Sequence, residues 1–384
     1  MNRVYLDNNA TTPLDPRARE AMLPWLGERW GNPSSIHSAG QDAREAVEEG
    51  RARVAALLGA RPEEVLFVAS GTEANNAVLL SAARDAGRGA HFVVSALEHP
   101  SVRATASDLE RLGCGLTVVP PERNGVVAPE AVAAALRPDT RLVCLMLASN
   151  EIGTLQPVAE VARLCRDRGV QLHCDAVQAA GKIAVRAGEI GADTITLGAH
   201  KFHGPLGAAA LWVRPGRELH PLLRGGGQER RRRASTENVA AIVGFGEVAR
   251  HAADELPRRQ AHLAGLRDRF EAGLEAIEDV RVHCQASPRL PNTSHAAFGG
   301  VEGEALVIRL DLAGFAVSTG SACASGTLEP SPTLLAMGLP AHEALSSLRV
   351  SFGMTNTVDD VDRFLDALGT EVRALRRLAP ALLR

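Results

Sequence analysis

The sequence predicts an α/β fold in which a large domain, built on a mainly parallel sheet, is joined to a smaller α+β domain. Apolar segments typical of buried strands alternate with helical segments up to residue 213. At 384 residues, the chain is also longer than one hydrophobic core usually supports. Finally, an acidic and a basic side chain each follow an apolar segment, which places polar groups at one edge of the predicted sheet.

The strands of the large sheet are expected at 65–68, 91–94, 142–147, 170–173, 194–197 and 208–213. Between the third and fourth of these segments, Val158, Val161 and Cys165 recur at helical spacing. Gly169 then supplies a C-terminal stop, so the segment is predicted to be a helix. The resulting β-α-β unit leads directly to Asp175.

The pattern changes in the last third of the chain. A long charged helix is expected over 251–278, followed by shorter strand candidates and a final helix over 358–375. We therefore predict a large domain of residues 13–250 and a small domain of residues 1–12 and 251–384. The first dozen residues are too short to fold alone, and we expect them to join the small domain or to cross the mouth of the site.

Composition and charge limit the class of partner. A net charge of −3 gives no basic surface for nucleic acid, and no apolar run approaches the length of a membrane span. Because the N-terminus lacks the apolar core of a signal peptide, we expect a cytoplasmic protein. The six cysteines have no metal-ligand spacing, so we expect neither a zinc site nor a disulfide framework; they are Cys114, Cys144, Cys165, Cys174, Cys284 and Cys323.

Asp175 and Lys201 form the most informative pair in the sequence. Asp175 ends one apolar strand, and Lys201, preceded by His200, lies just past the next strand. This layout suits pyridoxal phosphate, with the carboxylate against the pyridinium nitrogen and the lysine as the Schiff-base amine. The structural alternatives are a helix N-cap for Asp175 and a solvent-directed amine for Lys201.

Two further segments are candidates for binding the cofactor's phosphate. Gly71 and Thr72 follow a strand and open a helix, where free backbone N–H groups attract an anion. The alternative is an ordinary helix cap. The segment 224–238 combines a glycine turn with four consecutive arginines and a hydroxyl at Thr236. It is interpreted as a phosphate-facing loop or, alternatively, as a solvated charged surface.

Other polar residues also follow strands, and a functional role for them is favoured by the presence of Asp175 and Lys201. His99 is placed to stack on a pyridine ring and to exchange protons with substrate, although a single loop histidine is often incidental. Asn150 and Gln178 are candidate partners of the cofactor's phenolic oxygen, while Asn150 also suits a simple turn. Arg349, in a strand-like segment, is a candidate clamp for an amino acid carboxylate or a structural ion pair.

Cys323 lies in the small-residue segment 318–326, where a thiolate on a mobile loop would reach a bound substrate. A Schiff-base lysine combined with such a cysteine indicates sulfur chemistry.

Seven segments together resemble the NifS/IscS-type cysteine desulfurases, and the likeness spans nearly the whole chain. They are 5–12, 31–37, 70–76, 150–154, 200–201, 225–230 and 321–323. The resemblance implies a class V aminotransferase of pyridoxal-phosphate fold type I, similar to aspartate aminotransferase, with a seven-stranded type of large sheet and a homodimeric assembly. The segment 318–323 resembles the cysteine loop of group I.

The resemblance also implies a role for each candidate residue. Catalysis would use Lys201 as the Schiff-base lysine, His99 as the ring-stacking residue and Cys323 as the acceptor of sulfur from L-cysteine, with release of alanine. Arg349 would hold the substrate carboxylate. The cofactor-binding residues would be Gly71, Thr72, His99, Asn150, Asp175, Gln178, Gly198, His200 and Lys201, together with Thr236 of the partner subunit.

Two departures from the family pattern bear on this scheme. Gly198 stands where many members have a phosphate-binding serine, and Arg231 and Ser235 stand where glycine is common.

The sulfur acceptor is expected to be an iron-sulfur scaffold or a tRNA-thiolating enzyme. The alternative functions are an aminotransferase or lyase of the same fold, in which Cys323 is structural, and a non-catalytic scaffold partner.

Overall fold

The computed structural model describes residues 3–86, 89–320 and 329–378. Its largest element is a seven-stranded sheet in the order β2-β8-β7-β6-β5-β3-β4. The strands are β2 (Val65–Val68), β3 (His91–Ser95), β4 (Gly115–Val119), β5 (Thr140–Cys144), β6 (Gln171–Asp175), β7 (Thr194–Gly198) and β8 (Ala209–Val213). All neighbouring strands are parallel except at β8, which is antiparallel to both β2 and β7. The edge strand β4 was not among the predicted segments.

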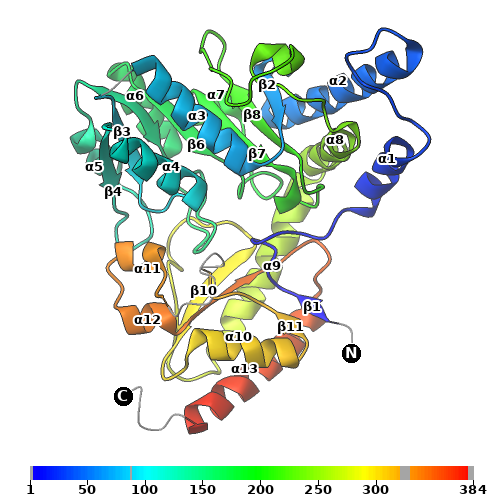
Figure 1. Cartoon of the computed structure of the whole chain (residues 1–384). Coiled ribbons are helices and arrows are strands. Elements are labelled where there is room, and N and C mark those ends of the chain that lie inside the picture. Colours follow the sequence, from blue (N-terminus) through cyan, green and yellow to red (C-terminus); the bar gives the residue numbers. More distant parts are fainter. Residues whose placement is uncertain (1–2, 87–88, 321–328, 379–384) are drawn as a thin grey trace.

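Alternate residues of each strand pack against helices on opposite faces of this sheet. In β2, Val65 and Phe67 belong to one buried cluster, while Leu66 and Val68 belong to another. The first cluster contains residues of α2 (Ser38–Leu58), α6 (Val158–Asp167) and α8 (Val239–Asp254), and the second contains residues of α3 (Gly71–Ala86) and α4 (Pro100–Arg111). Because helices cover both faces, the strands carry apolar side chains on both sides of the sheet. Figure 1 shows the sheet in the upper half of the molecule.

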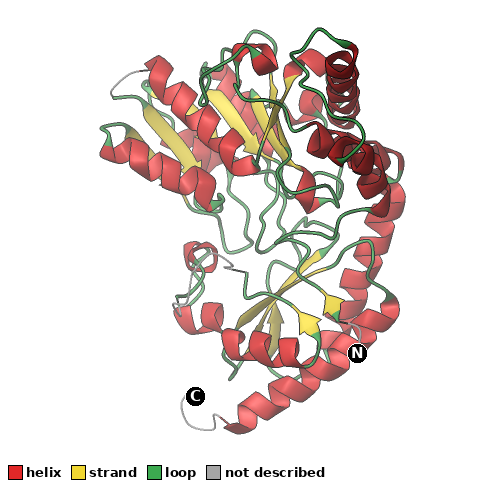
Figure 2. Cartoon of the chain, turned by 45° about the vertical axis from the view of Figure 1, so that its right-hand side comes forward, coloured by secondary structure: helices red, strands yellow, loops and turns green. Residues whose placement is uncertain are grey.

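A third apolar cluster lies around a smaller antiparallel sheet, β12-β10-β9. Its strands are β9 (Val280–Val282), β10 (Thr293–Phe298) and β12 (Ser347–Ser351), and β1 (Val4–Tyr5) pairs separately with β11 (Phe315–Ala316). The helices that pack here are α9 (Leu256–Leu274), α10 (Gly303–Leu312) and α13 (Val358–Leu378). Figure 2 shows these elements below the large sheet, with a column of helices connecting the two parts on one side.

The remaining helices are short or lie at the edges: α1 (Pro16–Leu26), α5 (Pro129–Ala135), α7 (Ala187–Ile190), α11 (Pro332–Ala336) and α12 (Ala341–Leu345). The single long helix predicted over 251–278 is wrong. α8 ends at Asp254 and α9 begins at Leu256, because Pro257 in the first turn of α9 has no N–H to continue α8. No helix among the described residues is long and apolar enough to cross a membrane.

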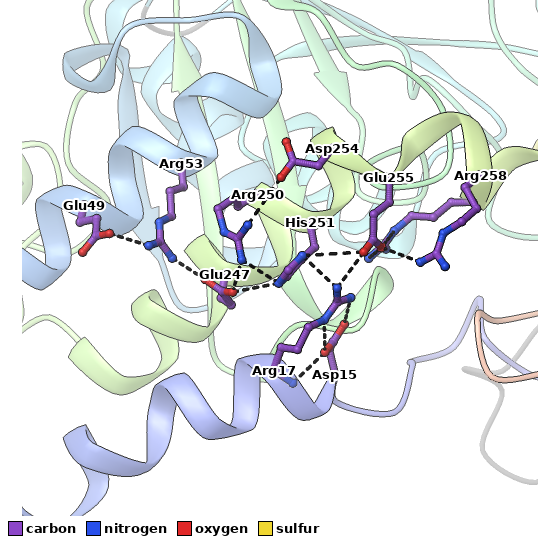
Figure 3. Close-up of polar contacts among 11 residues, drawn as sticks. Asp15, Arg17, Glu49, Arg53, Glu247, Arg250, His251, Asp254, Glu255 and Arg258 are labelled. Carbon is purple, nitrogen blue, oxygen red and sulfur yellow. Dashed lines mark hydrogen bonds and ion pairs between the residues drawn. The ribbon is translucent and has the colours of Figure 1, made fainter.

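Ion pairs hold α1 against the junction of α8 and α9 (Figure 3). Arg17 lies at the centre of the group. Its guanidinium donates to Asp15 at 2.7 Å and to Glu255 at 2.7 Å. Asp15 also caps α1 by accepting from the backbone N–H of Arg17. The network therefore fixes the N-terminal end of α1 against the helices α8 and α9.

Candidate active site

Most of the predicted site residues lie where strands of the large sheet end. Since these strands are parallel, their carboxyl ends share one edge of the sheet. The residues are Gly71 and Thr72 after β2, His99 after β3, Asn150 after β5, Asp175 at the end of β6, and Gly198, His200 and Lys201 at and just beyond the end of β7.

Asp175 is buried and held by two donors. Its Oδ2 accepts from Nδ2 of Asn75 at 2.7 Å, and its Oδ1 accepts from the backbone N–H of Val177 at 2.9 Å. Asn75 is itself fixed, because its Oδ1 lies 3.0 Å from Nε2 of His173. The bond between Asp175 and the N–H of Val177 resembles a turn cap. Asp175 therefore caps a turn and also presents a carboxylate at the edge of the sheet. Sequence reasoning included Asn75 in a motif but gave it no role.

His99 caps α4, and its ring interacts electrostatically with both Asp175 and Lys201. Its Nδ1 accepts from the backbone N–H of Ser101 at 3.1 Å, so the neutral ring carries its proton on Nε2. Burial lowers the pKa of His99; the charge of Asp175 opposes this effect and that of Lys201 adds to it. A neutral imidazole with an Nε2 proton is suited to stacking and to proton donation.

Lys201 lies on a 3₁₀ turn, Ala199–Lys201, that follows β7. Its Nζ donates to the backbone carbonyls of Asn9 and Ala10, both at 2.7 Å. The N-terminal segment therefore contacts Lys201 through Asn9 and Ala10, while its strand β1 pairs with β11. Thr12 extends this contact, since its N–H and Oγ1 both donate to the carbonyl of His200.

Asn9 forms hydrogen bonds with several of the predicted site residues, which no sequence pattern indicated. Its carbonyl also accepts from Nε2 of Gln178 at 2.9 Å, and its Nδ2 donates to the carbonyl of Asn150 at 3.2 Å. Its side chain further contacts Thr293 of β10 at 2.9 Å. Because these partners are far apart in sequence, only the tertiary fold identifies Asn9 as a site residue.

Helix α3 begins at the end of the site where phosphate binding was predicted. α3 has 16 residues, and the Thr72 side chain at its N-terminus is exposed. A Cβ at Gly71 would lie 3.0 Å from Cγ2 of Val177, so glycine is needed for close packing there. A Cβ at Gly198 would lie 3.2 Å from Cγ1 of Val177, so a serine there would require the Val177 side chain to shift by a few tenths of an ångström.

His200 lies beside this end of the site. Its Nδ1 is 3.1 Å from Oγ1 of Thr11. Burial, together with the charges of Lys201 and Lys182, lowers the pKa of His200 to about 4. The ring is therefore neutral at pH 7, so it can offer a hydrogen bond but no charge.

Arg349 projects from β12 and is 2% exposed. Its Nη2 donates to Asp7 at 2.6 Å, and its Nη1 donates to the carbonyls of Asn150 at 3.0 Å and Gly320 at 3.3 Å. Its Nε is buried without a hydrogen-bond partner among the described residues. A buried donor of this kind fits a missing acceptor, and the fork of a guanidinium suits a carboxylate.

Cys323 lies outside the described residues, but the stem of its loop is described. Ser318 pairs with Arg349 through two backbone hydrogen bonds, and Gly320 has φ 99° with no room for a side chain beside Glu151. The stem of the cysteine loop is thus bonded directly to the predicted carboxylate-binding arginine.

Thr236 lies on the loop that follows β8, and its side chain is exposed. The base of this loop is fixed by a buried ion pair, since Arg51 donates to both carboxylate oxygens of Glu229 at 2.7 and 2.8 Å. Arg231 and Ser235 have φ of 64° and 112°, the backbone region in which glycine is favoured. This positive φ gives a physical reason for the glycines of the family pattern at these two positions.

The donor set fits pyridoxal phosphate. A buried carboxylate, an amine and a helix N-terminus with a free threonine hydroxyl lie on one edge of the sheet, matching the ring nitrogen, the carbonyl carbon and the phosphate.

Comparison with known proteins places the chain in a family. The class-V aminotransferase model matches residues 4–364, so the chain belongs to the class-V aminotransferase family. Cysteine desulfurase IscS of Dictyoglomus turgidum is 42% identical over 98% of this chain and 96% of its own length. A cysteine desulfurase of Cereibacter sphaeroides is 46% identical over 99% and 98%. Within its family, the chain is a cysteine desulfurase of the IscS and NifS type.

Solved structures agree with this assignment. A NifS-like protein superposes with a TM-score of 0.90 at 34% identity, covering 97% of this chain and all of that chain. A NifS-like protein from Rickettsia africae gives a TM-score of 0.88 at 31% identity, with the same coverage. The predicted α/β fold type I is confirmed, and the family depends on pyridoxal phosphate.

Proposed function

We propose that this desulfurase binds pyridoxal phosphate and L-cysteine at the edge of the large sheet and transfers the substrate's sulfur to Cys323. The observation that carries the proposal is that Asp175, Lys201 and Arg349 are linked across the large and the small sheet. Asp175 and Lys201 both act electrostatically on His99, and Asn9 joins Lys201 to Asn150, whose carbonyl accepts from Arg349. The division into residues 13–250 and residues 1–12 with 251–384 remains part of this proposal.

The cofactor's contacts follow from the chemistry of each side chain. Asp175 would hold the protonated ring nitrogen, His99 would stack on the ring, and Asn150 and Gln178 would face the phenolic oxygen. Phosphate would bind at Gly71, Thr72, the Gly198 backbone and His200, with Thr236 of a second copy. When bound, pyridoxal phosphate withdraws electrons from the substrate's Cα and Cβ, which makes the Cβ–S bond breakable.

The protein's own groups would then carry the sulfur. Arg349 binds the substrate carboxylate and orients Cβ, and Lys201 moves the proton at Cα. The Cys323 thiolate attacks the substrate sulfur, the Cβ–S bond breaks, and an S–S bond forms on Cys323. His99, protonated at Nε2, is placed to supply a proton. The products are L-alanine and a persulfide, so the atoms balance without an added oxidant.

We further propose a cytoplasmic homodimer that passes this sulfur to an iron-sulfur scaffold or a tRNA-thiolating enzyme. Large apolar side chains on and after α1 support the dimer, since Leu26, Trp30 and Ile36 are 67%, 78% and 91% exposed. A dimer would also provide a partner for the exposed Thr236 side chain. Mixing Thr236→Ala subunits with Lys201→Ala subunits tests this arrangement: one active site per mixed dimer then combines both defects, and the other has neither.

The function is tested by measuring alanine and sulfide release from L-cysteine in the presence of a thiol reductant. Cys323→Ala is expected to bind the cofactor, to show its visible absorbance band, and to lose sulfide release. Cys114→Ala is the matched control, because this partly exposed thiol lies just before β4 at the far edge of the sheet. Equal activity of Cys323→Ala and wild type would instead indicate an ordinary lyase or aminotransferase.

A further inference from the structure

Lysine is almost absent from this chain. Of its 42 lysine and arginine residues, only Lys182 and Lys201 are lysines. The two border the same cavity of about 10 Å³. Lys201 has an assigned role in the proposed function, whereas Lys182 has none. All the other residues in this lysine and arginine count are arginines. The second lysine, Lys182, therefore lies beside the same cavity as Lys201.

Lys182 is 4% exposed and bonds to two amide oxygens. Its Nζ donates to Oε1 of Gln178 at 2.9 Å and to Oδ1 of Asn9 at 3.4 Å. On its other side, the Gln178 amide donates from Nε2 to the Asn9 carbonyl at 2.9 Å. A carbonyl oxygen only accepts, so the orientation of the Gln178 amide is unambiguous. One hydrogen of Nε2 is used by Asn9, and the second has no acceptor among the described residues.

We propose that Lys182 is a positioning residue: it fixes the Gln178 amide so that Nε2 donates to the phenolic oxygen of the bound cofactor. Without the Lys182 amine, Oε1 loses its donor, and only the bond from Nε2 to the Asn9 carbonyl is left to hold the amide. The inference rests on the proposed function, because it assumes the contact between Gln178 and the cofactor.

The chemistry of lysine explains why arginine does not replace it. Burial lowers the pKa of Lys182 well below its usual range, and the charges of Lys201 and Arg349 lower it further. An amine donates a hydrogen bond whether it is charged or neutral, so its contact with Gln178 persists when this pKa is lowered. Arginine cannot lose its charge in a protein, and the small cavity leaves no room for a guanidinium.

The experiment compares the pH at which the absorbance band of the cofactor-loaded protein changes. Lys182→Met keeps the length and removes the donor. Its midpoint is expected to rise by about one pH unit, the size of one lost hydrogen bond to a charged oxygen. Gln178→Ala is expected to raise the midpoint similarly, and Lys182→Met is expected to add nothing in the Gln178→Ala background.

A matched control separates positioning from stability. Arg259→Met removes another buried cation that borders the same cavity, and Arg259 bonds to Glu255 rather than to Gln178. It is expected to lower the thermal midpoint of the cofactor-free protein without moving the spectral midpoint. Lys182→Arg is expected not to restore the wild-type value.

Three results would overturn the proposal. An unchanged spectral midpoint in Lys182→Met would limit Lys182 to a structural role. A further rise in the double variant would mean that Lys182 acts through its charge. A colourless wild type under cofactor saturation would refute the proposed function itself, which the first two results leave intact.

Discussion

At the scale of single residues, Arg349 links substrate binding to the cysteine loop. It donates to Asp7, to Asn150 and to Gly320, and its Nε is a buried donor without a partner among the described residues. A carboxylate that met this nitrogen and one terminal nitrogen would be bound by two parallel hydrogen bonds.

Arg349→Lys is therefore expected to lower kcat/KM for L-cysteine by roughly 30-fold, since lysine keeps the charge but loses about 2 kcal/mol of bidentate bonding. Steady-state kinetics measure the effect, and Arg281→Lys on the exposed surface of β9 is the control. An unchanged kcat/KM in Arg349→Lys would mean that the carboxylate binds elsewhere.

At the scale of elements, the loop after β8 has an unfavourable backbone. Arg231 and Ser235 have positive φ, and Ser235, at 112°, lies beyond the left-handed helical region that non-glycine residues tolerate best. The Arg51–Glu229 ion pair holds the loop in this form from its base.

Ser235→Gly is expected to stabilise the protein by about 1 kcal/mol, and Arg231→Gly by less, because glycine adopts positive φ without strain. Arg232→Gly is the control in the same loop, since Arg232 has φ −98° and its replacement is expected to destabilise by a similar amount. Thermal or urea unfolding measures all three. Destabilisation by Ser235→Gly would contradict this account of the loop.

The ion pairs of Figure 3 make the junction between α1, α8 and α9 sensitive to acid. Burial raises the pKa of Asp15, but hydrogen bonds from Arg17 outweigh it and lower the pKa to about 2. A hydrogen bond from Arg17 likewise lowers the pKa of Glu255 to about 2. Because these pKa values are depressed in the folded state, the stabilisation is complete above the unfolded values and is lost as pH falls towards 2.

Arg17→Met is therefore expected to be less stable than wild type at pH 7, and this difference should shrink as pH falls from about 4 towards 2. Urea unfolding at a series of pH values measures it. Both carboxylates are partly exposed, so the difference will also decrease in high salt. A difference independent of pH would assign the effect to lost packing of the Arg17 side chain.

At the scale of the whole molecule, the sequence predicted what local patterns encode. Apolar runs marked six of the seven strands of the large sheet, and the positions of Asp175 and Lys201 just after two of them predicted the site edge. The break between α8 and α9 was missed because Pro257 was not weighed against a long charged pattern.

The residues that sequence reasoning missed act over long distances. Asn9 reaches Lys201 and Gln178, and Asn75 reaches Asp175, about 100 or more positions away. No periodicity marks such partners, because the fold alone brings them together. The scarcity of lysine was the one signal in the sequence that pointed to Lys182.

The most direct test of sulfur transfer is the mass of the protein after reaction with one equivalent of L-cysteine without reductant. The account predicts the gain of one sulfur atom on the peptide that contains Cys323, with one equivalent of alanine released, and neither product in Lys201→Ala. Alanine release without added mass on Cys323, or added sulfur on another cysteine, would contradict it.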